Sequence, residues 1–158
     1  RTDGYRSQLG QIDLSEHEAN VARVLGFPPE ESRTLFTAFF AGDRLDTDLV
    51  DFIRTLKKNY TTAVLSNYGS RLRWKITDLW KIGDAFDHLV ISSEVGLMKP
   101  DPMIYQIALE ATGSLPHEAV FIDDAPENVA AAQAVGMHAI RFTTPQATIQ
   151  QLQYLLAK

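Results

Sequence analysis

The feature that most constrains this chain is the alternation of short apolar runs with helical segments from residue 60 onward. Four runs rich in Val, Ile and Phe are too short for helices and are typical of strands; they cover residues 62–65, 88–91, 119–122 and 137–142. Helix-start residues and helical spacing occur between or after them, at 102–111, at 126–135 and from Thr144-Pro145 onward. Strands that alternate with helices form a parallel sheet covered on both faces, so the expected fold class is α/β.

The N-terminal part of the chain has a different pattern, because residues 1–58 contain only helical signals. Ser15 and Glu18 fit a capping box at the start of one helix. A following helix has four apolar residues on one face, which is more often the core of such a helical region than the wall of a ligand site: Leu35, Phe36, Phe39 and Phe40. We therefore expect a helical region over residues 1–44 and an α/β region over residues 45–158.

The composition excludes several classes of function. The 158 residues include 15 Lys and Arg against 20 Asp and Glu, and the net charge of −5 disfavours binding to a nucleic-acid backbone. The absence of Cys excludes disulfide scaffolds, cysteine zinc sites and thiol nucleophiles. No apolar run approaches the ~20 residues of a membrane span, and we expect no signal peptide. We expect no nucleic-acid or membrane partner and a cytoplasmic location.

Polar side chains follow three of the predicted strands. Residues 66–68 (Ser-Asn-Tyr) come after the first strand, Lys99 comes within a few residues of the second, and Asp123-Asp124 ends the third. Ligands bind beyond the carboxyl ends of the strands in open parallel sheets, so these groups should converge at one edge. Each group alone is explained by a helix cap or a solvated loop. Their occurrence at successive strand ends indicates a site.

These residue types suit a phosphoryl group held beside a hard cation. The hydroxyl of Ser66 and the backbone amides of Asn67 and Tyr68, at the start of a following helix, would form an anion site. Lys99 supplies a compact positive charge. The adjacent carboxylates repel each other unless a cation lies between them or one is protonated, and Mg²⁺ with oxygen ligands is the usual cation near phosphate.

The order of the three groups distinguishes two folds that use the same residue types. In bacterial receiver domains the acidic pair comes first and the lysine last. In this chain Ser66 comes first, Lys99 second and the pair Asp123-Asp124 last. The order found here resembles the haloacid dehalogenase superfamily of phosphotransferases. AVLSNYG, SSEVGLMKPDPMIY and AVFIDDAPENVAAAQAVGM match its second, third and fourth motifs, and residues 49–142 resemble it almost continuously. The chain is most similar to members with a small helical cap, among them sugar-phosphate phosphatases and the phosphatase domain of soluble epoxide hydrolases.

The resemblance implies a Rossmann-like core over residues 45–158 and a helical cap over residues 1–44. It also implies chemistry through an aspartyl-phosphate on a small phosphorylated metabolite. Ser66 and the amide of Asn67 would hold the phosphoryl oxygens, and Lys99 would neutralise charge between the phosphate and the nucleophile.

The resemblance also implies a dependence on Mg²⁺. Asp124 would bind the ion directly, and Asp123 directly or through water. Asn128, one helical turn after Asp124, would orient Lys99 or the surroundings of the metal; an exposed helix position is the alternative explanation for it.

The family's first motif, an apolar strand that ends in D-x-D or D-x-G and carries the nucleophile, has no match in the sequence. We expect this aspartate to lie upstream of Arg1. In this fold its strand sits between the strands that end at Ser66 and Asp123. Without that strand the chain should be inactive and poorly folded, with open strand edges. These edges and the apolar cap face would favour a homodimer.

Two other functions stay open at this point. A 2-haloacid dehalogenase uses the same nucleophile without a metal, and the pair Asp123-Asp124 disfavours it because that chemistry gives the pair no cation. A non-catalytic module that binds phosphate or a protein partner would have lost the first motif in evolution. Neither the substrate nor the oligomeric state is fixed by the sequence.

Overall fold

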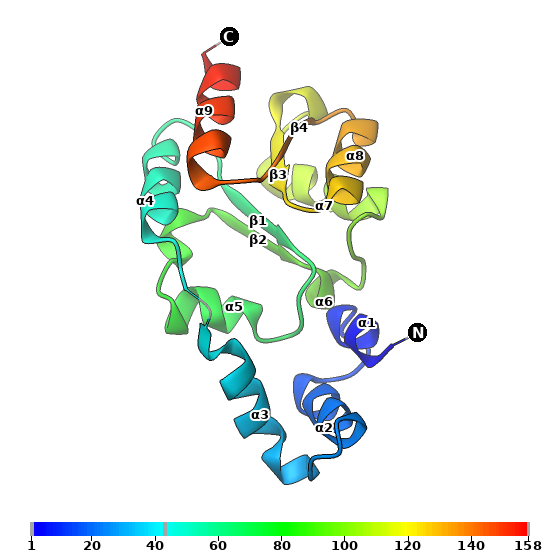
Figure 1. The fold of residues 1–158 in the computed structure, drawn as a ribbon. Coiled ribbons are helices and arrows are strands. Elements are labelled where there is room, and N and C mark those ends of the chain that lie inside the picture. The colour runs from blue at the N-terminus through cyan, green and yellow to red at the C-terminus, as the bar shows by residue number, and fades with distance from the viewer. Residues whose placement is uncertain (1, 43, 158) are drawn as a thin grey trace.

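The computed structural model describes residues 2–42 and 44–157. It contains two separate two-stranded sheets, both parallel, as shown in Figure 1. The strands are β1 (Ala63–Ser66), β2 (His88–Ile91), β3 (Val120–Asp123) and β4 (His138–Arg141). β1 pairs with β2, and β3 pairs with β4. The predicted α/β class with parallel strands is confirmed, and all four expected apolar runs contain a strand.

Neither sheet is joined to the other within the described residues. β1 and β3 therefore each have one edge without a strand partner in that part of the chain. A groove of about 850 Å³ lies between them and is lined by residues of both strands together with residues of neighbouring helices. An open edge of this kind is where the expected additional strand would pair.

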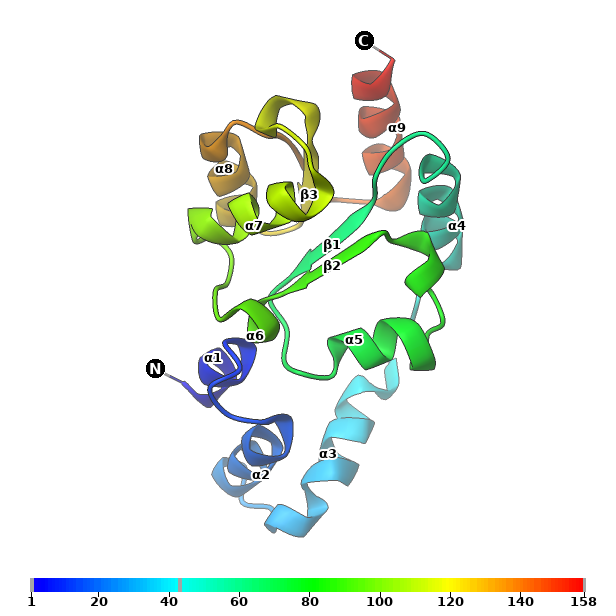
Figure 2. The ribbon, with the colours of Figure 1, turned by 180° about the vertical axis from the view of Figure 1, so that it is seen from behind.

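Helices cover the sheets from both sides (Figures 1 and 2). They are α4 (Thr47–Leu56), α5 (Leu72–Trp74), α6 (Ser92–Val95), α7 (Pro102–Thr112), α8 (Pro126–Val135) and α9 (Pro145–Leu156). Adjacent side chains of β2 point to opposite faces of the sheet and pack against different helices. Val90 packs with Ile104 of α7 and with Phe121, whereas Ile91 packs with Val50 of α4 and with Leu72 of α5. Side chains alternate between the two faces of a strand, so β2 is buried on both of its faces.

The N-terminal region is helical, as predicted, and contains α1 (Asp3–Gln8), α2 (Leu14–Val24) and α3 (Ser32–Phe39). It extends from one end of the α/β region (Figure 2). Its apolar face is only partly buried. Leu35 and Phe36 are half-buried, but Phe39 is 77% exposed. The expectation that this face forms the core of the helical region is therefore met only by Leu35 and Phe36, because Phe39 and Phe40 are exposed. The boundary at residue 44 stays a prediction.

Helix starts follow the expected chemistry with one exception. Asp101 caps α7 and Thr144 caps α9 by accepting backbone N–H bonds, with Pro at the first helical position in both helices. The exception is α2, where the predicted box of Ser15 and Glu18 is wrong. Asp13 accepts the N–H of Glu16 at 2.8 Å and caps the helix instead.

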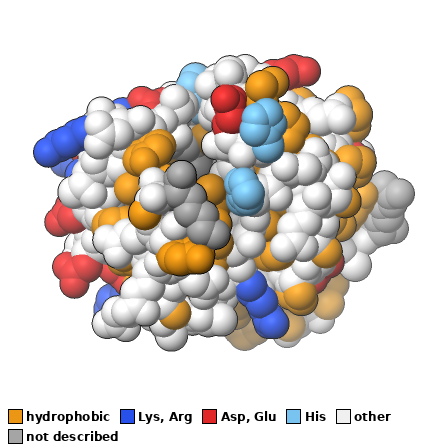
Figure 3. Space-filling view, turned by 90° about the horizontal axis from the view of Figure 1, so that it is seen from above, with side chains coloured by type: hydrophobic (Ala, Val, Ile, Leu, Met, Phe, Trp, Pro, Cys, Tyr) orange, Lys and Arg blue, Asp and Glu red, His pale blue; other side chains and the backbone are white. Residues whose placement is uncertain are grey.

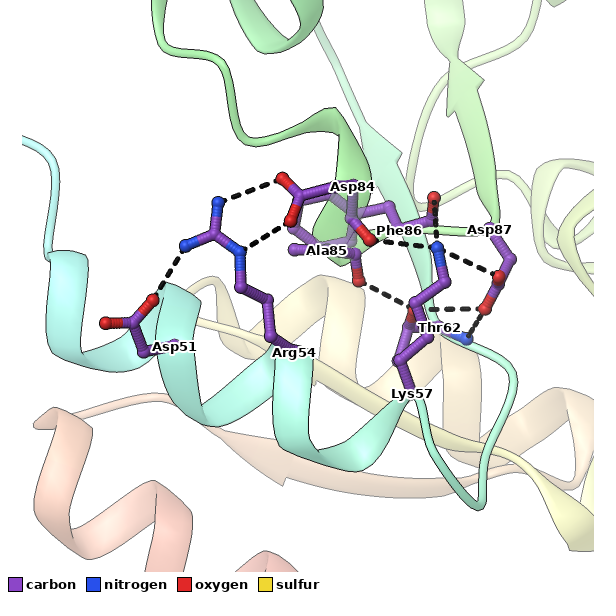
Figure 4. Close-up of polar contacts among 8 residues, drawn as sticks. All are labelled: Asp51, Arg54, Lys57, Thr62, Asp84, Ala85, Phe86 and Asp87. Carbon is purple, nitrogen blue, oxygen red and sulfur yellow. Dashed lines mark hydrogen bonds and ion pairs between the residues drawn. The ribbon is translucent and has the colours of Figure 1, made fainter.

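An ion-pair network holds α4 against the amino-terminal ends of β1 and β2 (Figure 4). Arg54 donates two hydrogen bonds to Asp84 and one to Asp51, and Lys57 pairs with Asp87 at 3.1 Å. Hydrogen bonding to Arg54 lowers the pKa of Asp84 below its usual range. This network lies at the strand ends opposite to the loops that sequence analysis selected, so it serves the fold.

Figure 3 shows how charged side chains are distributed on one face of the molecule. On the face shown in Figure 3, Lys and Arg side chains are scattered among hydrophobic and other residues and form no basic patch. Among the helices that the structure describes, none is both long and apolar enough to cross a membrane.

Candidate functional site

Lys99 brings the carboxyl ends of β1 and β3 together. Its Nζ donates to the carbonyl oxygen of Leu65 at 2.9 Å and to Oδ2 of Asp123 at 2.6 Å. Leu65 lies one residue before the end of β1, and Asp123 is the last residue of β3. The side chains of Lys99 and Asp123 are only 9% and 8% exposed. The predicted convergence of these strand ends is therefore present in the structure.

Both carboxylate oxygens of Asp123 are occupied by protein donors. Oδ2 accepts from Lys99, while Oδ1 accepts from the backbone N–H of Ala125 at 3.0 Å and from Nδ2 of Asn128 at 2.9 Å. Burial alone would raise the pKa of Asp123. The hydrogen bonds from these three donors outweigh burial and hold the pKa below its ordinary value. Asp123 is thus an ionised, fully bonded partner of Lys99.

Asn128 is placed on Asp123 by a residue that sequence analysis missed. Tyr105 is fully buried in α7, and its hydroxyl donates to the carbonyl oxygen of Asn128 at 2.9 Å. Burial, together with the charge of Asp123, raises the pKa of Tyr105 to about 12. The signal available in the sequence was only a tyrosine on the apolar face of a helix, which is typical of a core residue.

The loop after β1 is only partly as predicted. Ser66 is half-buried, and its hydroxyl has no hydrogen-bond partner in the described chain, so it is available to a ligand. The backbone N–H of Tyr68, however, donates to Oγ of Ser92 at 3.0 Å. The next helix, α5, begins only at Leu72. The expected anion site with the amide of Tyr68 at a helix start is wrong, because Ser92 takes that amide.

Asn67 contacts the backbone of Lys99 through its side chain. Oδ1 accepts the N–H of Lys99 and Nδ2 donates to its carbonyl oxygen, each at 2.8 Å. The two loops that carry the predicted phosphate-binding residues are therefore joined to each other. The role expected for the Asn67 backbone amide, holding a phosphoryl oxygen, stays a prediction.

Asp124 differs from Asp123 in its exposure and in its hydrogen bonding. Its side chain is exposed and has no hydrogen-bond or ion-pair partner in the parts of the chain that the structure describes. It lines the groove between the sheets together with Asp123. A carboxylate without a protein partner, next to a buried ion pair, is available to a cation.

The carboxylates at the end of β3 could supply only part of the ligands of a Mg²⁺ ion. No three acidic or His side chains within residues 2–42 and 44–157 form a cluster that could hold a metal. Magnesium usually retains several waters and takes one or two carboxylates together with phosphate oxygens. Asp124, which is exposed, can supply the one carboxylate that this minimal requirement asks for. A direct or water-mediated role of Asp123 stays a prediction.

Comparisons with known proteins give a consistent result. The family model described as haloacid dehalogenase-like hydrolase matches residues 5–136. A sesquiterpene phosphatase of Aspergillus oryzae is 28% identical over 94% of this chain and 76% of its own length. A D-ribitol-5-phosphate phosphatase of Bacteroides thetaiotaomicron is 27% identical over 85% of this chain and 62% of its own length. Mouse bifunctional epoxide hydrolase 2 is 30% identical over 61% of this chain, which spans 18% of that protein.

Solved structures show the same fold. A predicted hydrolase of Porphyromonas gingivalis superposes with a TM-score of 0.78 at 23% identity, covering 97% of this chain and 78% of the other. A family enzyme of Bacteroides thetaiotaomicron, in complex with magnesium and inorganic phosphate, superposes with a TM-score of 0.75 at 24% identity over 87% of this chain and 73% of its own. Because the family model covers most of the sequence, the chain belongs to the haloacid dehalogenase-like hydrolases.

Proposed function

We propose that this chain forms the greater part of a Mg²⁺-dependent phosphatase that acts on a small phosphorylated metabolite. The observation that carries the proposal is the amine of Lys99, which is hydrogen-bonded to the carboxyl ends of both β1 and β3. Phosphatases among the relatives support the reaction class. The chain spans less than two thirds of several relatives, so the activity of the whole protein belongs to this proposal.

Each residue then has a defined task. The hydroxyl of Ser66 and the N–H of Asn67 donate to phosphoryl oxygens, and the ammonium group of Lys99 offsets their negative charge. Asp123 keeps Lys99 in place through the ion pair. Asp124 would hold Mg²⁺, which supplies a second positive charge on the phosphoryl oxygens when it is bound.

The nucleophile comes from outside residues 1–158 in this proposal. Its carboxylate would attack phosphorus, the alcohol of the substrate would leave, and water would then hydrolyse the aspartyl-phosphate. The groove between the open edges of β1 and β3 supports this arrangement, because a strand paired with both edges would end next to Lys99. The chain without that strand is proposed to be inactive.

The test is phosphate release from a panel of polyol, sugar and terpenyl phosphates, measured with and without Mg²⁺. The protein should carry the coding sequence that precedes Arg1. We expect release only with Mg²⁺, and loss of release in Lys99→Met and Asp124→Asn. Unchanged turnover in either variant would refute these roles. Turnover of a 2-haloacid that is indifferent to Mg²⁺ would instead favour the dehalogenase.

A third outcome distinguishes a non-catalytic module. Such a protein would bind inorganic phosphate or a protein partner without turnover, and the preceding coding sequence would contain no apolar strand that ends in D-x-D or D-x-G. The cytoplasmic location and the homodimer expected from the sequence stay predictions. Fractionation and analytical ultracentrifugation would test them.

A further inference from the structure

We propose that Asn67 is a positioning residue whose side-chain amide fixes the amine of Lys99 between the two sheets. The inference concerns the placement of Lys99, and only its consequence for phosphate binding rests on the proposed function. It assigns to the side chain of Asn67 a task separate from the one expected for its backbone amide.

The backbone of Lys99 needs such a support because it lies in a loop. The residue follows α6, which ends at Val95, and precedes α7, which begins at Pro102. Apart from the bonds to Asn67, neither the N–H nor the carbonyl oxygen of Lys99 has a partner among the described residues. A residue that is only 9% exposed and lacks regular backbone bonds takes its position from such side-chain contacts.

The carboxamide of Asn67 matches this task chemically. One peptide residue presents one donor and one acceptor, and a carboxamide presents the complementary acceptor and donor. Both bonds measure 2.8 Å, so the pair holds Lys99 on both sides of its Cα atom. An aspartate at position 67 has nearly the same shape but cannot donate to the carbonyl oxygen, and an alanine makes neither bond.

The two ends of Lys99 are anchored on the same strand. Its backbone is bonded to Asn67, directly after β1, and its amine returns to the carbonyl oxygen of Leu65 in β1. β1 therefore determines where the ammonium group meets Asp123. Without Asn67, the backbone of Lys99 has no hydrogen-bond partner among the described residues, and the amine is its remaining polar anchor.

The test measures access to the amine directly. The protein with the coding sequence that precedes Arg1 is treated with the N-hydroxysuccinimide ester of acetic acid, and mass spectrometry follows acetylation at Lys99 and at the exposed reference residue Lys58. We expect Lys99 to react about tenfold faster in Asn67→Ala, because the bonds that hold its loop are lost. Lys58 should be unaffected. Arg54→Met, which removes ion pairs at the opposite strand ends, should leave Lys99 protected.

Asn67→Asp provides a second variant that retains the volume of the side chain, and it is decisive if Asn67→Ala does not fold. Faster acetylation of Lys99 in the aspartate variant supports the proposal, since only the bond to the carbonyl oxygen is lost. A rate equal to that of the unmodified chain in every folded variant overturns it. The Arg54→Met control separates a local effect from general loosening of the fold.

Titration with inorganic phosphate in the presence of MgCl₂ separates this inference from the proposed function. If Asn67 acts through Lys99, Asn67→Ala and Lys99→Met each weaken binding by about tenfold, and the double variant binds no more weakly than Lys99→Met. A further loss in the double variant would mean that the side chain of Asn67 contacts phosphate itself, which overturns the inference. Faster acetylation with unchanged phosphate affinity would retain the positioning role and refute the phosphate-binding role of Lys99.

Discussion

Replacement of Lys99 by Met should destabilise the fold through the carboxylate that it leaves behind. The variant removes the donor to the carbonyl oxygen of Leu65 and the charged partner of Asp123, whose side chain is 8% exposed. Loss of one partner of a buried ion pair costs about 3–5 kcal/mol. Asp123 keeps its bonds from Asn128 and Ala125, so we place the cost at the lower end, about 3 kcal/mol at pH 7.

Urea denaturation of the protein with the coding sequence that precedes Arg1, followed by circular dichroism, measures this cost, and a double variant tests its origin. Lys99→Met combined with Asp123→Asn removes both charges, so no uncompensated carboxylate remains. We expect the double variant to lose about 1–2 kcal/mol, which is less than the single variant loses. A double variant that is as unstable as Lys99→Met would refute the argument from the buried charge. So would a single variant as stable as the original chain.

The pH dependence provides an independent check. The folded pKa of Asp123 lies below its ordinary value, so the ion pair stabilises the fold fully above the unfolded pKa of about 3.9. This contribution is lost as the pH falls through the folded pKa. The difference in unfolding free energy between the original chain and Lys99→Met should therefore be constant near neutral pH and shrink below about pH 4. A difference that grows in acid would contradict this assignment of charge.

Three further variants test other parts of the molecule. Asp124→Asn should weaken Mg²⁺-dependent phosphate binding and change the unfolding free energy by no more than about 0.5 kcal/mol, since its side chain is exposed and without a partner among the described residues; a large loss of stability would contradict this. Tyr105→Phe should cost about 1 kcal/mol in urea denaturation, through the lost bond to Asn128. Gly10→Ala should lower the melting temperature and cost more than about 1 kcal/mol, because φ is +69° and the new Cβ would lie 2.3 Å from the carbonyl oxygen of Ser93. An unchanged melting temperature would show that the loop adapts.

Much of the fold could be predicted because the relevant signals are local. The length and composition of the apolar runs identified the strands. Proline and capping residues marked the starts of α7 and α9. The convergence of Lys99 with Asp123 followed from the rule that parallel strands end at one edge. These inferences require only neighbouring residues and a general property of parallel sheets.

Two features of the site were missed because they depend on contacts between residues far apart in the chain. The hydroxyl that accepts the backbone N–H of Tyr68 belongs to Ser92, 24 residues away. The residues next to Tyr68 in the sequence give no signal of this contact. The pairing of Asn67 with the backbone of Lys99 spans 32 residues. At α2 two acceptors competed for one helix start, and Asp13 was the better placed because it lies directly before Leu14.

Ser92 also receives a second neighbour from the helical region. Its hydroxyl, which is buried and accepts from Tyr68, donates to the carbonyl oxygen of Gln8 in α1 at 2.6 Å. One oxygen atom thus ties the first helix of the chain to the loop beyond β1. A displacement of α1 must stretch or break this link, so the position of the helical region and the position of the loop after β1 depend on each other.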